Sequence, residues 1–407
     1  MNTLVVSQSS TAPTLSRATA TALKLLQHIK GGSLRLSFAG GQTLSLGGGP
    51  ERATLHINDE RVFRRVLAEG DIGFAESWID GDWHSEQLAE LLTLLAENRG
   101  QLARALHGSW LPVLLHRLRH LTRVNTRAGS KRNILAHYDL GNDFYKLWLD
   151  PSMSYSAALF EAADADEQGT LEKAQRRKYL RLLEMLNPAP GAHILEIGCG
   201  WGGFAEIATM EYGCKVHGIT LSPSQLAWSR ERAQSRGFSH LATFSLTDYR
   251  DIRGQYDHIV SIEMFEAVGE RFWPAYFDQL RSCLKPGGRV AVQSITIANE
   301  RFKDYRRGTD FIQRHIFPGG MLPSPAVFER LAANAKFQIN DRIAFGEAYA
   351  QTLAHWHQRF EAAWPEIARQ GYDERFHRLW RFYLAYCEAG FRSGATDVYQ
   401  FLLEQRA

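Results

Sequence analysis

A glycine-rich turn is the part of this sequence best suited to hold a ligand. From Ile194 it reads Ile-Leu-Glu-Ile-Gly-Cys-Gly-Trp-Gly-Gly, so a buried strand leads into glycines that let the backbone approach a bound molecule. A dinucleotide site uses similar glycines but usually adds an acid about 20 residues later, and residues 216–222 contain none. Glu196 instead precedes the glycines, where it can meet an amino or hydroxyl group. A ligand without a pyrophosphate, a dinucleotide and a bare structural turn are the alternatives, in that order. The glycines are Gly198, Gly200 and Gly202.

Two carboxylates three residues apart form a second candidate site. Glu263 and Glu266 follow a predicted strand at His258–Ile262, at the carboxyl end where α/β sheets bind ligands. Burial and like charge raise the pKa of one member of such a pair, which suits a base that must take and hold a proton. The alternative is that Glu263 only hydrogen-bonds a backbone amide or a basic side chain.

The elements that position these residues alternate between strands and helices. This pattern is typical of a doubly wound, mainly parallel α/β sheet, and we assign it to a domain at residues 133–407. The aromatic-rich segment Ala344–Arg406 is expected to be helical. The other expected strands are His193–Ile197, Lys215–Ile219, Ala242–Ser245 and Arg289–Ser294, and the expected helices are Phe204–Tyr212, Pro223–Arg236 and Trp273–Leu284.

Residues 1–95 are predicted to form a small α+β accessory domain. Ser33–Phe38 and Gln42–Leu46 alternate around two glycines and indicate a β-hairpin. A strand at Ala53–Ile57 and a helix at Asp59–Leu67 follow. Beyond them, aromatic residues lie between acids and glycines, and we interpret them as a capped helix and turn packed by Trp78 and Trp83, in preference to a catalytic role for the acids.

A basic amphipathic linker at residues 96–132 joins the two domains. From Arg99 to Arg132 there are eight Arg or Lys residues and three histidines but no Asp or Glu, with leucines recurring at helix-like spacing. Such a segment can lie at the surface of an anionic membrane. A basic helix packed on its own protein is an equal alternative. Nucleic acid is disfavoured because the basic residues alternate with aliphatic side chains rather than stacking aromatics.

Composition limits the class of protein further. The chain has 407 residues, a formal net charge of +3 and 44% hydrophobic residues, which predicts folded domains with real cores. Its four cysteines are far apart, so neither a zinc site nor a disulfide framework is indicated, and no metal is expected. No secretory signal and no uninterrupted apolar stretch of membrane-spanning length is present, so we expect a cytoplasmic protein whose membrane contact is peripheral.

Several longer motifs resemble one family of enzymes. The glycine turn is similar to motif I of S-adenosylmethionine (SAM) methyltransferases, and the whole order of motifs from about residue 30 onward resembles the cyclopropane-fatty-acyl-phospholipid synthases. The resemblance implies a class I methyltransferase fold. It also implies transfer of a one-carbon unit from SAM to the cis double bond of an unsaturated acyl chain, in a phospholipid at the inner face of the cell membrane. The other matching motifs are residues 137–145, 149–156, 264–269, 316–320 and 345–349.

The resemblance also assigns the cofactor residues. It places Tyr155 and Ser156 at the methionine end of SAM and the glycines in the turn around it. The remaining assignments are Thr220 with Gln225 at the ribose, and Asp248 with Tyr249 at the adenine.

The base that removes a proton is where this sequence departs from the family. Relatives bind a bicarbonate ion through a Cys, a Glu, a His, the backbone of an Ile and a Tyr. Glu266, Ile295 and Tyr349 match, but Ala157 and Gln293 stand at the Cys and His positions, which argues against bicarbonate. Glu263 stands where the resembling relatives have a glycine. Our hypothesis is that Glu266, helped by Glu263, replaces the anion. Aromatic faces that stabilise the cation are expected from Tyr138, Phe265, Phe317 and Tyr349, with core packing as the alternative for each.

Two products are open at this point. A base that reaches the new methyl group closes a cyclopropane ring, which is the first expectation. If none does, the cation loses another proton or shifts a hydride, and the same kind of acyl chain becomes methyl-branched or methylene-substituted, in some relatives with a separate reductase. A catalytically silent lipid- or SAM-binding protein is a third reading, which the intact glycine turn and Glu266 disfavour. A homodimer on the anionic membrane surface is a further expectation.

Overall fold

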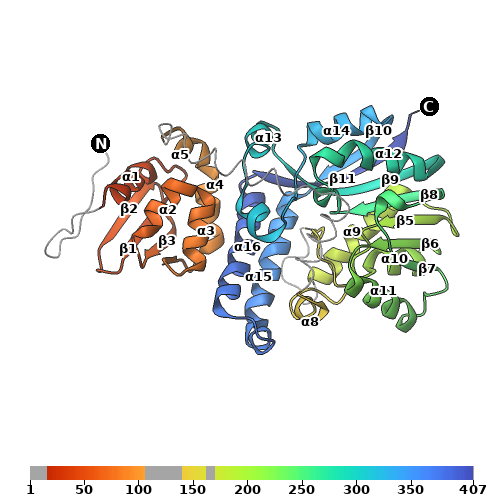
Figure 1. Ribbon diagram of the computed structural model, residues 1–407, viewed down its shortest axis with the longest axis horizontal. Coiled ribbons are helices and arrows are strands. Elements are labelled where there is room, and N and C mark those ends of the chain that lie inside the picture. Colours follow the sequence, from red (N-terminus) through yellow and green to blue (C-terminus); the bar gives the residue numbers. More distant parts are fainter. Residues whose placement is uncertain (1–15, 106–139, 162–169, 407) are drawn as a thin grey trace.

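The computed structural model describes residues 16–105, 140–161 and 170–406. Most of the basic linker and the predicted catalytic residue Tyr138 lie outside these ranges. A small N-terminal domain, a central pair of long helices and a large twisted sheet follow one another along the longest axis of the molecule (Figure 1).

The large sheet contains seven strands in the order β10-β11-β9-β8-β5-β6-β7. Strands β5 to β9 pair in parallel, and β11 is antiparallel to both β9 and β10. This is the doubly wound, mainly parallel sheet that the sequence predicted. The strands are β5 His193–Ile197, β6 Lys215–Thr220, β7 Ala242–Leu246, β8 Tyr256–Ile262, β9 Leu284–Ile297, β10 Phe337–Ala344 and β11 Thr396–Gln405.

Helices cover both faces of this sheet, and each face has its own apolar core. One core joins Leu182, Phe204 and Val216, and the other joins Phe277, Val292 and Phe328. The helices of the first face are α9 Thr170–Leu186, α10 Gly203–Met210 and α11 Pro223–Ser235, and those of the second are α12 Trp273–Cys283 and α14 Pro325–Asn334. Shorter helices are α8 Asn142–Tyr145 and α13 Asn299–Tyr305.

The prediction of a helical C-terminus was partly wrong. The helices α15 Gly346–Arg369 and α16 Glu374–Arg392 are present, but Thr396–Gln405 forms β11. This strand is inserted between β9 and β10. Its conformation is therefore determined by pairing with distant segments, and not by the aromatic-rich composition on which the prediction was based.

The N-terminal domain is a four-stranded sheet in the order β2-β1-β3-β4, covered by helices. The predicted hairpin is confirmed, since β1 and β2 pair antiparallel, and β3 joins β1 in parallel. The elements are α1 Arg17–Leu26, β1 Gly32–Phe38, β2 Thr43–Gly48, β3 Glu51–Ile57, α2 Arg61–Glu69, α3 Asp71–Ile79, β4 Trp83–His84, α4 Leu88–Glu97 and α5 Arg99–Ala105. Helix α4 runs two residues past the boundary drawn at residue 95.

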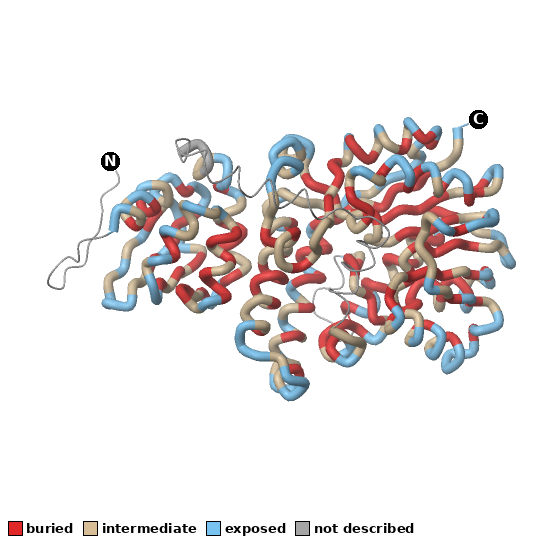
Figure 2. Tube along the Cα trace, in the orientation of Figure 1, coloured by how far each residue is buried: buried red, intermediate tan, exposed pale blue. Residues whose placement is uncertain are grey.

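The N-terminal domain packs directly on α16. The Trp78 indole donates a hydrogen bond to the carbonyl of Arg378 at 2.8 Å, and the Arg378 guanidinium donates back to the carbonyl of Trp78 at 2.6 Å. Trp78 and Trp83 are buried, as expected, and both contact Phe382. Residues of this domain and of the central helices therefore belong to one buried apolar core, and Figure 2 shows buried segments in both parts.

Candidate functional site

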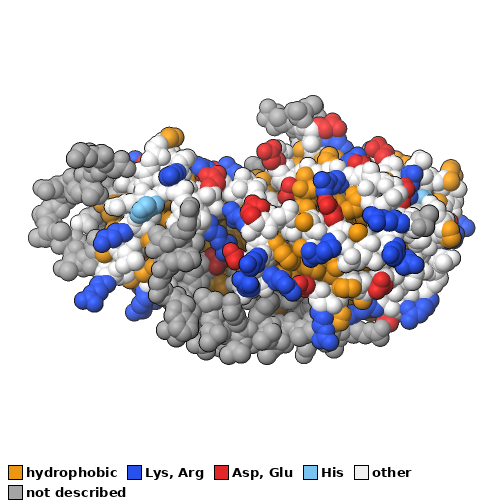
Figure 3. Space-filling view, turned by 90° about the horizontal axis from the view of Figure 1, so that it is seen from above, with side chains coloured by type: hydrophobic (Ala, Val, Ile, Leu, Met, Phe, Trp, Pro, Cys, Tyr) orange, Lys and Arg blue, Asp and Glu red, His pale blue; other side chains and the backbone are white. Residues whose placement is uncertain are grey.

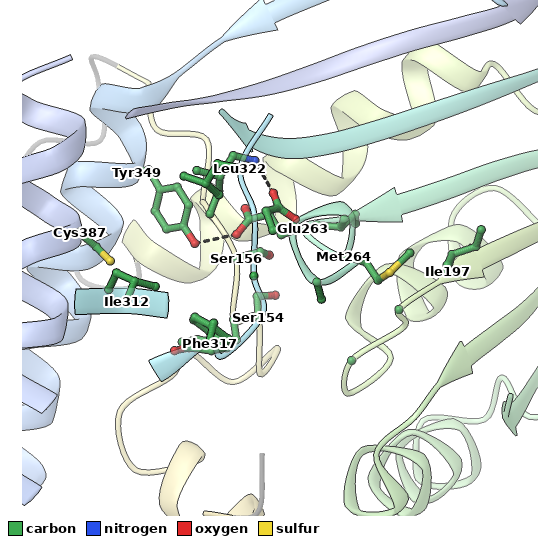
Figure 4. A pocket seen from close by; sticks show the side chains of 18 of the residues that line it. Ser154, Ser156, Ile197, Glu263, Met264, Ile312, Phe317, Leu322, Tyr349 and Cys387 are labelled. Atoms are coloured by element: carbon green, nitrogen blue, oxygen red, sulfur yellow. Dashed lines mark hydrogen bonds between the residues drawn. The ribbon is translucent and has the colours of Figure 1, made fainter. Parts of the chain in front are cut away.

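A cavity of about 330 Å³ opens at the carboxyl ends of the parallel strands. The glycine turn after β5, Thr220 at the end of β6 and Glu263 after β8 form one side of it. The central helices close the other side with Tyr349 and Cys387, and Glu263 and Tyr349 point toward each other between the two sides (Figure 4).

Eight of the ten predicted cofactor residues line this cavity. The two exceptions are Gly202 and Asp248. Gly202 is the N-cap of α10, and the Asp248 carboxylate accepts two hydrogen bonds from the Arg250 guanidinium, at 2.8 and 2.6 Å. The eight lining residues are Tyr155, Ser156, Glu196, Gly198, Gly200, Thr220, Gln225 and Tyr249.

The glycine turn has a backbone conformation that requires glycines. Gly198, Gly200 and Gly202 have φ angles of 82°, 52° and 84°, in the left-handed region that other residues adopt only with strain. The turn thereby reverses direction within a few residues and leaves its backbone beside the cavity.

A short hydrogen-bonded chain fixes the end of β6. The Thr220 hydroxyl donates to the side-chain carbonyl of Gln225 at 2.8 Å and accepts from the backbone amide of Ser222 at 3.1 Å. Ser222 in turn caps α11 by accepting from the amide of Gln225. Both predicted ribose residues are therefore held rigidly at the cavity wall.

Glu196 has an unsatisfied acceptor. Its side chain is buried, and among the described residues its Oε2 atom has no hydrogen-bond partner. Burial raises the pKa of Glu196 well above its usual value, and the nearby Lys178 lowers it in part. An amino or hydroxyl donor from a ligand would satisfy this atom, and SAM carries both groups. The residues present therefore fit SAM.

The Glu263 carboxylate accepts three hydrogen bonds at the cavity. Its Oε1 atom accepts from the backbone amide of Ala157 at 2.8 Å and from the Gln293 side-chain amide at 2.7 Å, while Oε2 accepts from the Tyr349 hydroxyl at 2.6 Å. Glu263 itself has a φ of 50°, which is unusual for a residue with a side chain. Glu263 therefore bonds a backbone amide, as one alternative expected, and it also faces the cavity, so its role as a base stays a prediction.

Glu266 is held separately from Glu263. Its Oε1 atom accepts from the backbone amide of Ile295 and from the Ser294 hydroxyl, while Oε2 has no partner among the described residues. Burial and the neighbouring Glu263 raise the pKa of Glu266 to about 8. Burial also raises the pKa of Glu263, but hydrogen bonds from Tyr349, Ala157 and Gln293 oppose that effect.

Polar residues that the sequence analysis missed lie behind these carboxylates. Lys178 on α9 is fully buried and donates to the Ser156 hydroxyl at 2.5 Å and to the side-chain carbonyl of Gln175 at 2.7 Å. Burial lowers the pKa of Lys178 to about 8, opposed by the charges of Glu263 and Glu196 among others. The available signal was its spacing, because Lys178 follows Leu171 and Ala174 on the apolar face of α9.

The far end of the cavity is mainly apolar. Ile312, Phe317 and Leu353 line it, so two of the described aromatic candidates, Phe317 and Tyr349, are in position. Phe265 is not, because its ring is buried against Trp273 and Phe328 in the core beside the sheet. Core packing, the alternative stated for Phe265, is therefore what the structure contains.

One group outside the cavity has the donor set of a metal site. His56 and His84 pair across β3 and β4, and their ligand atoms and that of Glu86 lie within 4.8 Å of one another. The two imidazole rings are stacked, with centroids 4.5 Å apart, and His56 bonds Glu86 at 3.1 Å. The expectation that the protein uses no metal stays a prediction.

Comparison with known proteins identifies the family. The family profile described as mycolic acid cyclopropane synthetase matches residues 125–401. Tuberculostearic acid methyltransferase UfaA1 of Mycobacterium tuberculosis is 41% identical over 91% of this chain and 87% of its own length. Cyclopropane-fatty-acyl-phospholipid synthase of Escherichia coli K12 is 34% identical over 88% of this chain and 89% of its own.

Solved structures agree with the sequence comparison. Mycolic acid cyclopropane synthase CmaA1, complexed with SAH and CTAB, is 30% identical, with a TM-score of 0.62 over 68% of this chain and 98% of its own. Cyclopropane synthase MmaA2 of Mycobacterium tuberculosis is 32% identical, with a TM-score of 0.62 over 67% and 97%. The predicted class I methyltransferase fold is thus confirmed, and S-adenosylmethionine is the cofactor. The chain belongs to the mycolic acid cyclopropane synthetase family and is a SAM-dependent lipid methyltransferase.

Proposed function

We propose that this enzyme methylates the cis double bond of unsaturated phospholipid acyl chains and that Glu263 is its built-in base. The observation that carries the proposal is the set of donors around Glu263. Tyr349, Gln293 and the amide of Ala157 stand at three of the positions where relatives resembling this chain bind bicarbonate, and here all three donate to one side chain. A carboxylate that belongs to the protein therefore takes the place of the diffusible anion.

SAM supplies an electrophilic methyl group on its sulfonium. An alkene is a weak nucleophile, so the cavity must hold the double bond in line with that methyl group and exclude water. The electron pair of the double bond forms the new carbon–carbon bond, and positive charge remains on the neighbouring carbon. The rings of Phe317 and Tyr349 line the apolar end of the cavity, where their faces can stabilise this charge.

Glu263 is better suited than Glu266 to accept the proton, which changes the emphasis of the initial hypothesis. A pKa of about 8 keeps most of Glu266 protonated at neutral pH, whereas three donors favour the ionised form of Glu263. A carboxylate has about four acceptor positions, and three of those of Glu263 are occupied. The fourth, on Oε2, remains for the proton.

We favour a methylene product, which a separate reductase with its own reductant would convert into a methyl-branched chain. In the cyclopropane route and in the methylene route alike, the base removes a proton from the new methyl group. A ring forms if the proton leaves before the charge moves, and a methylene group forms if a hydride first shifts to the neighbouring carbon. Burial raises the pKa of Glu263, and the three hydrogen bonds oppose this rise and so limit its strength as a base, which gives the shift time to occur. The 41% identical relative is named a methyltransferase of tuberculostearic acid, which supports this assignment.

Cyclopropane formation is the second candidate. It is supported by the 34% identical synthase of Escherichia coli and by the two cyclopropane synthases among the solved structures. The two routes use the same base and remove a proton from the same methyl group, so substituting the base cannot distinguish them. Analysis of the product can.

Contact with an anionic membrane surface is part of the proposal. One face of the molecule presents hydrophobic side chains among charged side chains of both signs (Figure 3), and the Lys and Arg side chains there suit anionic lipid headgroups. No helix in the described part of the chain has both the length and the apolar character of a membrane span. We include in the proposal a peripheral, cytoplasmic location, a homodimer, and a reductase partner if the product is a methylene chain.

The test is product analysis with the purified full chain, SAM and vesicles of dioleoylphosphatidylglycerol, in bicarbonate-depleted buffer and after adding bicarbonate. NMR and mass spectrometry should detect an exocyclic methylene group at equal rates in both buffers. Cyclopropane signals would select the second candidate, and absence of any lipid product would overturn the proposed function.

The matched pair of variants is Glu263→Gln and Glu404→Gln. The first should lose about 10²- to 10⁴-fold in turnover, the usual contribution of a general base. The second makes the same chemical change in the Glu404–Arg289 ion pair on the sheet and should stay near wild type. Unchanged turnover in Glu263→Gln would refute Glu263 as the base.

A further inference from the structure

We infer that Gln400, a residue outside the cavity lining, positions the base by fixing the orientation of the Gln293 amide. This inference rests on the proposed role of Glu263. Gln400 and Gln293 are directly paired across the antiparallel strands β11 and β9, and both are fully buried. Gln400 has no place among the cofactor or catalytic residues suggested by the sequence.

The orientation of the Gln400 amide is set by a backbone carbonyl. Its Nε2 atom donates to the carbonyl of Lys178 at 3.3 Å and to the Oε1 atom of Gln293 at 3.0 Å. A carbonyl can only accept, so a flipped Gln400 would set oxygen against oxygen at Lys178. The Oε1 atom of Gln400 has no partner among the described residues, so the contacts of its NH₂ group determine the orientation.

The orientation of Gln293 follows from that of Gln400. Because its Oε1 atom receives the hydrogen bond from Gln400, its Nε2 atom faces the other way. That nitrogen donates to Glu263 at 2.7 Å and lies 3.4 Å from the carbonyl of Ala157, a second group that can only accept. Acceptors at both ends of the pair therefore leave one consistent arrangement, in which an N–H points at the carboxylate of Glu263.

This arrangement matters because a glutamine can present either a donor or an acceptor. If Gln293 turned its oxygen toward Glu263, two partial or full negative charges would meet in a buried site and the carboxylate would take up a proton. Gln400 prevents this without touching the cavity. It is thus a positioning residue that favours the ionised form of Glu263.

Other groups also act on Glu263 and must stay constant in the test. Tyr349 on α15 donates to it, the buried Lys178 on α9 favours its charged form, and Glu266 carries like charge when ionised. None of these three side chains is altered by a substitution at residue 400.

The test compares Gln400→Met, Gln293→Met and the double variant, with kcat, KM for lipid and SAM affinity measured from pH 5.5 to 9.5. Methionine keeps length and flexibility but cannot donate. Gln400→Met should lower kcat at pH 7 about 10-fold, below the full contribution of a general base. The acidic limb of its kcat–pH profile should move to higher pH by about one unit. Its affinity for SAM should stay unchanged. In the Gln293→Met background, Gln400→Met should have no further effect on kcat.

The control is Thr209→Val on α10. Among the described residues, the buried Thr209 hydroxyl bonds only carbonyls of its own helix, those of Ala205 and Glu206. The substitution therefore removes a buried hydrogen bond that does not involve Glu263, and the pH profile of this variant should match wild type. If Gln400→Met leaves the profile unmoved, or lowers kcat equally with and without Gln293, the inference is overturned.

A readout without turnover separates this inference from the proposed function. Infrared titration, with the Glu263 carboxyl band assigned by its loss in Glu263→Gln, should show a higher midpoint in Gln400→Met. If the wild type makes no lipid product but the midpoint moves, the proposed function fails and the positioning role stands. If the wild type makes the lipid product but the midpoint is the same in Gln400→Met, the proposed function stands and the positioning role of Gln400 fails.

Discussion

Removing the hydroxyl of Tyr349 should convert this enzyme into one that needs a higher pH. In Tyr349→Phe the donor to Oε2 of Glu263, at 2.6 Å, is lost. The ring should keep its place, because it stacks on Phe391 with centroids 4.4 Å apart and is 7% exposed. The substitution therefore isolates one hydrogen bond.

The magnitude follows from the charge on the acceptor. A hydrogen bond to a charged group contributes about 1.5–3 kcal/mol, and about 1.4 kcal/mol corresponds to one pH unit in a pKa. Loss of the donor should raise the pKa of Glu263 by about one to two pH units. Below the new pKa, kcat should fall about 10- to 100-fold, since the base is then mostly protonated. Above it, activity should return.

Initial rates on dioleoylphosphatidylglycerol vesicles between pH 5.5 and 9.5 would measure this shift. Tyr383→Phe is the matched control, because its hydroxyl bonds Tyr155 at 2.6 Å in the same cavity and, within the described ranges, makes no hydrogen bond to Glu263. That variant should keep the wild-type profile even if SAM binding weakens. A Tyr349→Phe enzyme whose rate falls equally at all pH values would refute the reasoning, because the hydroxyl would then act on something other than the charge of Glu263.

Two further predictions concern the other buried acids. Glu266→Gln should retain turnover within a few-fold at pH 7, since Glu266 is mostly neutral there. It should also flatten the pH dependence of unfolding, measured in urea. Wild-type stability from this group is present below pH 4.5 and declines as pH rises toward about 8, because the folded state keeps the proton longer than the unfolded state. If the free energy of unfolding of the variant changed with pH as steeply as that of the wild type, the raised pKa of Glu266 would be contradicted. Glu196→Ala should weaken SAM binding about 10- to 100-fold in calorimetry, because it removes the acceptor left unsatisfied in the cavity wall. Unaltered affinity would show that Glu196 does not contact SAM.

Local sequence signals predicted the elements of the central sheet well. Five strands and three helices of the methyltransferase core were expected within a few residues, except that β9 begins five residues earlier and ends three residues later than predicted. The glycine turn and the carboxylate pair were placed correctly at the carboxyl edge of the sheet. These features depend on short-range periodicity and on turn chemistry, which a single sequence records directly.

The missed features depend on contacts between distant segments. Strand β11 forms because its backbone pairs with β9 on one side and with β10 on the other. The pairing of Gln400 with Gln293 joins residues 107 positions apart, and Lys178 reaches Ser156 from another element. The hydrogen-bond partners of Glu263 could not be predicted for the same reason. No local pattern indicates that Tyr349 and Ala157 meet at one carboxylate.

The left-handed backbone at Glu263 suggests how such an enzyme could arise. Resemblance to the family places a glycine at this position, and a φ of 50° is a conformation that glycine adopts without strain. A side chain there costs about 1–2 kcal/mol, which three hydrogen bonds can offset. A substitution at an existing turn would then attach the catalytic carboxylate covalently beside two donors that need not change, the Tyr349 hydroxyl and the backbone amide of Ala157, while Gln293 at the His position is a further change. Residues that bound the anion in an ancestral enzyme would then have positioned the carboxylate that replaced it.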